Sequence, residues 1–359
     1  MLFKSRKWFI LIFSAYYLAH IVGAFYSDNM QVVWSDLETK LSFLIIPLIV
    51  LTSDVFTREN IVELLKTYLF GSVIAAIFSL IVSTFSFVIT ENTDVFYYQL
   101  LSYFQHPGYF SMYLNFSVAI ILILILHQRG KLNYKYYLAL TFLIVFIYQL
   151  SSRMGLIILI ALLMYSLFYV LLPKMKLKTT FFSLILSFSI SLAIIYVSSQ
   201  YINRFEVAIS QLEEGNENSS AGSRILLWKY SLELFLENPI LGVGTGDVDD
   251  VVQNKFEEES FTYAVKSHLN PHNQFIQAGV ALGIVGVLAL AIPFILPLFY
   301  IRKEQLFIYP LFAFIVAASC LTESAFERQS GVVFYALFNT ILFFTLPTHA
   351  TKQENKLEQ

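Results

Sequence analysis

Long apolar runs constrain the fold of this chain more than any other feature. Charged residues make up only 13% of its 359 residues, against about 25% in an ordinary soluble protein. A chain with so little charge cannot keep its surface hydrated, so lipid must be its main solvent. A helix needs about 20 mostly apolar residues to cross a bilayer. We therefore expect an all-α integral membrane protein with about ten transmembrane helices, at residues 8–25, 39–53, 67–90, 108–126, 137–150, 154–172, 179–200, 273–301, 305–322 and 331–347.

The positions of Lys and Arg predict the orientation of these helices. Cytoplasmic loops of membrane proteins carry an excess of basic residues. If both termini are cytoplasmic, 15 of the 23 basic residues fall in inner loops. The short outer loop at 91–107 then contains acidic residues but no Lys or Arg. We therefore expect a multi-pass membrane protein with an even number of helices and both termini in the cytoplasm.

One outer segment is much longer than the others. Residues 201–272 form a polar stretch with 12 acidic and five basic residues, which we call the large loop. Ser223 is expected to cap a helix over 224–237 that an Asn-Pro pair ends, and a second helix is expected near 247–259. The predicted organisation is helices one to seven in 1–200, the large loop in 201–272, helices eight to ten in 273–347 and a cytoplasmic tail in 348–359.

Composition also disfavours several classes of function. The net charge is −2 and no segment forms a basic domain, which excludes a nucleic-acid-binding protein. The single cysteine, Cys320, can form neither an intramolecular disulfide nor a metal cluster, and we expect it to be a small apolar helix residue. His268 and His272 have metal-ligand spacing, but Pro271 interrupts the helical register between them. No metal or cofactor is expected.

Two arginines stand out on the acidic outer side. Arg153 lies in a short link, 151–155, between two apolar helices, where a cation without a compensating anion costs about 2.5–3.5 kcal/mol. Arg224 begins the expected helix of the large loop, and a helix N-terminus itself favours anions. The planar guanidinium binds phosphate oxygens in pairs, so both residues predict a phosphate site. The alternatives are a snorkelling side chain for Arg153 and a solvated one for Arg224.

His272 lies where the large loop returns to the membrane. A neutral imidazole can accept a hydroxyl proton near pH 7, which makes His272 the candidate base. A histidine that caps the loop is the alternative. Behind it, Gly279, Gly283 and Gly286 are expected to give the helix a small-residue face for close packing.

Weaker signals surround these three residues. The glycine-rich turn at 242–246 follows no strand, so we do not expect a dinucleotide site there. Residues 323–328 are expected to form a solvated turn with a local ion pair. The minor candidates for substrate binding are Arg204, His106, Asn273 and Trp228. Interfacial anchoring is the simpler role for Arg204, and loop termination is the simpler role for His106.

The predicted topology places Arg153, Arg224 and His272 on the same outer side, although they come from three distant parts of the chain. Two cations and one base at a lipid–water boundary suit a lipid-linked phosphate donor and a hydroxyl acceptor. A transporter usually needs ionisable groups near the bilayer midplane, where these apolar runs contain almost none. Chemistry at the membrane surface is therefore expected.

Three sequence elements occur in order along the chain. They are Ser152-Arg153-x-Gly155, then Ser223-Arg224 followed by Trp228 and the glycine-rich turn, then His272-Asn273 with glycines at 283 and 286. Together they resemble the superfamily of O-antigen ligases and O-antigen polymerases, which transfer lipid-linked glycans. The resemblance covers most of the chain from about residue 100 onward.

The resemblance implies a fold like that of C-type glycosyltransferases, in the bacterial inner membrane with the large loop in the periplasm. It implies metal-independent, inverting transfer of a glycan from an undecaprenyl-diphosphate donor to an acceptor hydroxyl. Arg153 and Arg224 would bind the diphosphate, and His272 would orient or deprotonate the hydroxyl. O-antigen ligation to lipid A–core is the first expectation. A polymerase of the same superfamily, and a transporter or flippase for lipid-linked sugar, are the alternatives.

Overall fold

The computed structural model consists of helices wherever it describes the chain. No strand occurs in the described residues, which confirms the all-helical expectation. Glu59–Thr90, Pro107–Leu126 and Gln274–Phe299 are long and apolar enough to cross a membrane. The total of ten spans remains a prediction, because the seventh apolar run lies outside the described residues. The residues described are 8–53, 56–127, 133–171, 189, 222–300 and 308–344.

The chain divides into two compact units. The first combines Met1–Asp54, Val197–Tyr300 and Cys320–Gln359, and the second combines Val55–Tyr196 and Ile301–Ser319. The first unit therefore combines the N-terminal and C-terminal parts of the chain with the large loop and nearly all of the eighth apolar run.

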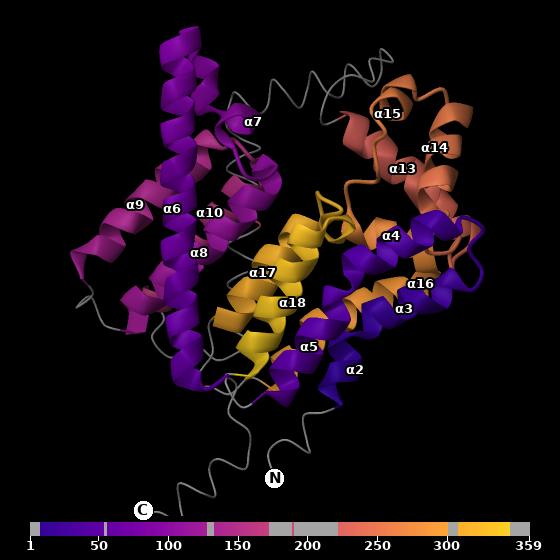
Figure 1. The fold of residues 1–359 in the computed structure, drawn as a ribbon, viewed down its shortest axis with the longest axis horizontal. Helices are drawn as coiled ribbons and strands as arrows, with labels where there is room; N and C mark the ends of the chain where they lie inside the picture. The colour runs from indigo at the N-terminus through magenta and orange to yellow at the C-terminus, as the bar shows by residue number, and fades with distance from the viewer. Residues whose placement is uncertain are drawn as a thin grey trace, which may run out of the picture. The chain divides into compact units, whose positions relative to one another are not determined.

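In the first unit, the central helix is α16, against which α3 and α13 pack, while α5 packs against α18 (Figure 1). The segment 26–38 lies between two predicted apolar helices, yet most of it is helical and belongs to α4. Asn29 caps α4 by accepting a hydrogen bond from Val32 N (3.3 Å). The helices are α2 (Phe9–Phe13), α3 (Ala15–Ala24), α4 (Met30–Lys40), α5 (Ser42–Thr52), α13 (Gly222–Glu237), α14 (Val248–Glu258), α15 (Thr262–Lys266), α16 (Gln274–Ile295), η2 (Leu296–Tyr300), η3 (Ala325–Glu327) and α18 (Gln329–Phe344).

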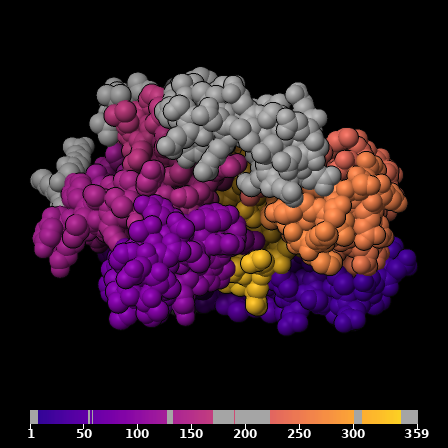
Figure 2. Space-filling view, turned by 90° about the horizontal axis from the view of Figure 1, so that it is seen from above, coloured from indigo at the N-terminus to yellow at the C-terminus, as the bar shows by residue number. Residues whose placement is uncertain are grey.

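The described part of the large loop shares a hydrophobic core with α16. Figure 2 shows the orange surface of α13–α15 adjoining the indigo surface of the N-terminal helices. The two predicted helices are confirmed, and α13 ends at Glu237 as expected. Ser223 lies inside α13, which already includes Gly222, so its expected role as the N-cap is wrong. The buried core residues are Leu227, Tyr230, Leu234, Val248, Val252, Phe256, Phe261, Ala264, Val280, Ala281 and Leu282.

The glycine-rich turn braces a break in α16. At Gly283 the backbone leaves helical geometry (φ 60°, ψ −154°), so nearby carbonyl groups lose their helical partners. Val243 N and Gly244 N donate hydrogen bonds to the carbonyls of Val280 and Ala281, both at 2.9 Å. The turn therefore satisfies the backbone groups that the break leaves, which is a structural role. The small-residue face allows the expected close packing, but the break itself is not expected from the sequence.

We expect Gly283→Ala to lower the unfolding temperature of the purified protein. A left-handed conformation costs an L-residue about 1–2 kcal/mol. A Cβ at this position would also lie 2.3 Å from the backbone of Ile240. Gly71→Ala is the matched control, because Gly71 is helical, has nothing within 4 Å of the added Cβ, and gains from alanine's higher helix propensity. Equal unfolding temperatures for Gly283→Ala and the unmodified protein would contradict this role.

The second unit contains the third to sixth apolar runs as helices. In it α8 packs against α6, α9 and α10. The rings of Phe116 and Phe312 meet edge to face, with centroids 5.1 Å apart. Cys320, where α17 ends, is fully buried, as expected for a small apolar residue. The helices are α6 (Arg58–Thr90), η1 (Thr93–Phe96), α7 (Tyr98–Leu101), α8 (Pro107–His127), α9 (Tyr134–Gln149), α10 (Arg153–Leu171) and α17 (Ile308–Cys320).

Candidate functional site

The start of α16 holds His272 in a fixed backbone position. Asn273 is the N-cap, and its Oδ1 accepts hydrogen bonds from Phe275 N (2.9 Å) and Ile276 N (3.1 Å). Its Nδ2 donates to the carbonyl of Leu321 at 3.1 Å, which joins the start of α16 to the segment after α17. His272 precedes this cap in the left-handed conformation, with φ 47°. Such strain in a residue other than glycine persists only where the surroundings enforce it.

Glu323 joins His272 to Arg224. Its Oε1 lies 3.3 Å from Arg224 Nη2, and its Oε2 lies 3.4 Å from His272 Nδ1. The Glu323 side chain is 14% exposed, whereas those of Arg224 and His272 are 31% and 29% exposed. The carboxylate is therefore mostly shielded, while the cation and the imidazole remain open to a substrate.

This arrangement suits proton transfer next to a bound anion. When Nδ1 of an imidazole faces a carboxylate, Nε2 is left to act as the base, and the carboxylate stabilises the imidazolium that forms. A guanidinium has five N–H groups, and the contact of Arg224 with Glu323 is made through Nη2. Arg224 can therefore face Glu323 and a phosphate oxygen at the same time.

The two glutamates of the segment 323–328 are less solvated than the expected turn. Glu323 pairs with Arg224 and His272, and Glu327 pairs with Lys40 at 2.9 Å. The side chains of both glutamates are largely shielded from solvent. Their partners lie between 51 and 287 residues away in the sequence, so no local motif identifies them. In the sequence, only the rarity of charged residues next to apolar helices draws attention to these two glutamates.

Arg153 belongs to the second unit, where it is the first residue of α10. Ser152 Oγ accepts a hydrogen bond from Gly155 N (3.3 Å), as an N-cap does. Gly155 allows α10 to approach α8, because a Cβ there would lie 2.5 Å from Ser111 Oγ, and its carbonyl accepts from Asn115 Nδ2 at 3.0 Å. The Ser-Arg-x-Gly element thus sets the arginine on the first turn of a closely packed helix, where the backbone favours anions.

The minor candidates have mostly structural roles where they are described. His106 Nδ1 accepts a hydrogen bond from Gly108 N at 3.3 Å, next to the start of α8. Trp228 packs against the hydrophobic core of the large loop, and Asn273 caps α16. Arg204 lies outside the described residues. Substrate contacts by these four residues stay predictions.

Comparison with known proteins agrees with the sequence elements. Residues 138–291 match the family model described as O-antigen ligase, and this segment includes Arg153, Arg224 and His272. The match confirms the resemblance to the O-antigen ligase superfamily. An uncharacterized protein of Haemophilus influenzae (strain ATCC 51907 / DSM 11121 / KW20 / Rd) is 30% identical over 96 residues. That alignment covers 27% of this chain and 24% of the relative's length.

Proposed function

We propose that this chain, whose residues 138–291 match the O-antigen ligase family, is a membrane-bound glycosyltransferase. It transfers a glycan from an undecaprenyl-diphosphate donor to an acceptor hydroxyl at the outer face of the bacterial inner membrane. Ligation of O-antigen to lipid A–core is the reaction we favour. The observation that supports the proposal is the convergence of Arg224 and His272 on Glu323, which brings a guanidinium and an imidazole to one carboxylate.

In the proposed reaction the acceptor oxygen attacks the anomeric carbon while the bond from that carbon to the diphosphate oxygen breaks. The hydroxyl proton passes to His272 Nε2, and the bonding electron pair leaves with the diphosphate. Negative charge on the leaving group develops in the transition state, so fixed cations stabilise that state more than the ground state. Arg224 supplies one such cation, and the role of Arg153 in binding the diphosphate stays a prediction from the sequence. Attack opposite the leaving group inverts the anomeric centre.

The product of the purified protein tests this proposal. The full chain in a bilayer nanodisc is supplied with undecaprenyl-diphosphate-linked glycan and lipid A–core. We expect glycan to appear on the lipid A–core together with an equal amount of undecaprenyl diphosphate. A reaction without acceptor is the control, and it should leave the donor intact.

Two other products would change the conclusion. Extension of one lipid-linked repeat unit by another would identify a polymerase with the same chemistry. Movement of intact donor across sealed vesicles, without release of undecaprenyl diphosphate, would identify a transporter and contradict glycosyl transfer.

A further inference from the structure

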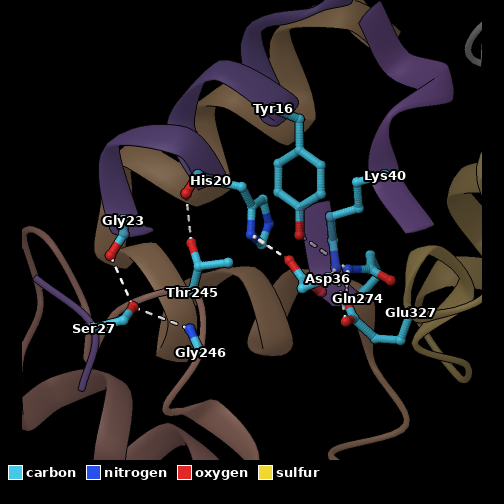
Figure 3. Close-up of polar contacts among 10 residues, drawn as sticks. All are labelled: Tyr16, His20, Gly23, Ser27, Asp36, Lys40, Thr245, Gly246, Gln274 and Glu327. Carbon is cyan, nitrogen blue, oxygen red and sulfur yellow. Dashed lines mark hydrogen bonds and ion pairs between the residues drawn. The ribbon is translucent and has the colours of Figure 1, made fainter. Parts of the chain in front are cut away.

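A buried polar network lies beside the candidate site and includes residues of the N-terminal helices (Figure 3). Lys40, the last residue of α4, has a fully buried side chain and pairs with the carboxylates of Asp36 and Glu327. Its Nζ lies 2.9 Å from Glu327 Oε2. Burial alone raises the pKa of Asp36, but the adjacent Lys40 ammonium and the His20 side chain together outweigh burial and hold that pKa well below its usual range. Lys40 is therefore a buried cation between two carboxylates.

Gln274 connects this ion cluster to the first turn of α16. Its Nε2 donates to Glu327 Oε1 at 3.0 Å and to the hydroxyl of Tyr16 at 3.1 Å. Its Oε1 accepts a hydrogen bond from the backbone N–H of Phe326 at 2.6 Å. Gln274 is completely buried, and Tyr16 is 1% exposed. A single side chain thus binds α3, α16 and η3 together.

The network fixes the two backbone segments that carry the candidate base and its carboxylate partner. Gln274 lies two residues after His272 on the same chain segment, and Phe326 lies three residues after Glu323. The 3.4 Å contact between His272 Nδ1 and Glu323 Oε2 spans these segments, so it depends on their separation. Removal of the Lys40 charge would leave the carboxylates of Asp36 and Glu327 without the cation between them. Glu327 would then move away from Lys40, and Gln274 would lose its hydrogen bond to Glu327 Oε1.

Stability alone does not explain a buried cation here. Apolar residues of similar volume often replace a buried ion cluster with no loss of stability, whereas charged groups fix one arrangement of their neighbours. The cluster joins residues 287 positions apart in the sequence, at the point where the site segments meet.

We propose that Lys40 is a positioning residue, which acts through Glu327 and Gln274 to hold His272 and Glu323 in contact. The N-terminal helices α3 and α4 are thereby part of the machinery of the site. The effect on catalysis rests on the proposed glycosyl transfer, whereas the effect on the position of His272 does not.

Lys40→Met tests this proposal, with Lys66→Met as the matched control. Lys66 is an exposed lysine that pairs with Glu63 on α6. The first measurement is the rate at which diethyl pyrocarbonate modifies His272, relative to exposed His268 in the same sample, followed by mass spectrometry. We expect a several-fold change in this ratio for Lys40→Met and none for Lys66→Met. The second measurement is glycan transfer, where kcat is expected to fall about 100-fold in Lys40→Met while the KM for the donor stays near that of the unmodified protein.

The outcomes separate positioning from folding and from the proposed function. An unchanged ratio and unchanged kcat in folded Lys40→Met overturn the proposal, and so does a loss of activity that follows only the folded fraction. If Lys40→Met does not fold, Tyr16→Phe replaces it, because this substitution removes only the hydroxyl that Gln274 contacts. An unchanged modification ratio of His272 to His268 in Tyr16→Phe also overturns the proposal. If the unmodified protein transfers no glycan, the proposed function fails, yet the modification ratio still decides whether Lys40 positions His272.

Discussion

His272→Asn is expected to slow glycan transfer strongly while leaving donor binding in place. Asparagine tolerates the left-handed backbone that His272 adopts, so the variant should keep the local fold. Its amide cannot accept a proton from the acceptor hydroxyl at neutral pH. Loss of a general base typically slows a reaction about 10²–10⁴-fold. The rate of product formation and the affinity for undecaprenyl-diphosphate-linked glycan are measured on the same preparation.

His268→Asn provides a matched control for that variant. His268 is exposed, lies four residues earlier, and also has a left-handed backbone, with φ 46°. The same substitution is therefore made at the same kind of backbone position, outside the contacts of Glu323. We expect His268→Asn to transfer glycan at the normal rate. A normal transfer rate in His272→Asn would show that His272 is not the general base.

Local signals in the sequence are sufficient for two helix ends that frame the site, but not for the start of α13, which lies before the expected cap Ser223. A proline two residues beyond Glu237 ends α13 where expected, because the residue before a proline avoids helical geometry. Asn273 likewise marks the start of α16 through the capping ability of its short side chain. Such signals act within a few residues. They suffice to predict Arg224 on a helix and His272 next to the start of another, without any tertiary contact.

Contacts between distant segments could not be predicted in this way. Lys40 counts as one of the outer basic residues by sequence, yet it is fully buried against Glu327, 287 residues away. Glu323 lies in a short segment with the composition of a solvated turn. Its contacts with Arg224 and His272 form only when α13 and the start of α16 come together. The break at Gly283 depends in the same way on the close approach of Ile240. In each case the decisive partner is tertiary, and neither hydropathy nor spacing encodes it.

Residues outside the segment that matches the O-antigen ligase family therefore complete the candidate site. The match covers residues 138–291, which include Arg224 and His272 but neither Lys40 nor Glu323. The matched segment contains Arg224 and His272, and flanking segments of the same unit contain Glu323, on the link after α17, and Lys40, on α4. Variation in these flanks can therefore alter the geometry of the site without changing the shared sequence elements.

Arg224→Ala is expected to reduce kcat/KM for the lipid-linked donor about 10²–10³-fold, which corresponds to a barrier increase of about 2.7–4 kcal/mol. The physical reason is that the charge of the diphosphate grows as the glycosidic bond breaks, so the cation matters most in the transition state. Arg224 is 31% exposed and its pair with Glu323 is open to water, so we expect little change in stability. The kcat/KM of Arg224→Lys should fall between those of the unmodified protein and Arg224→Ala, because lysine keeps the charge but not the planar pair of donors.

Lys229→Ala separates this specific role from the general charge of α13. Lys229 is an exposed cation on the same helix, with its Nζ 5.1 Å from the centre of the Tyr230 ring. Its removal lowers the charge of α13 by the same amount as Arg224→Ala but leaves the contact with Glu323 intact. Steady-state transfer rates over a range of donor concentrations are compared for the two variants. Similar losses would mean that the helix attracts the donor by net charge alone, whereas a loss confined to Arg224→Ala places the leaving group at this guanidinium.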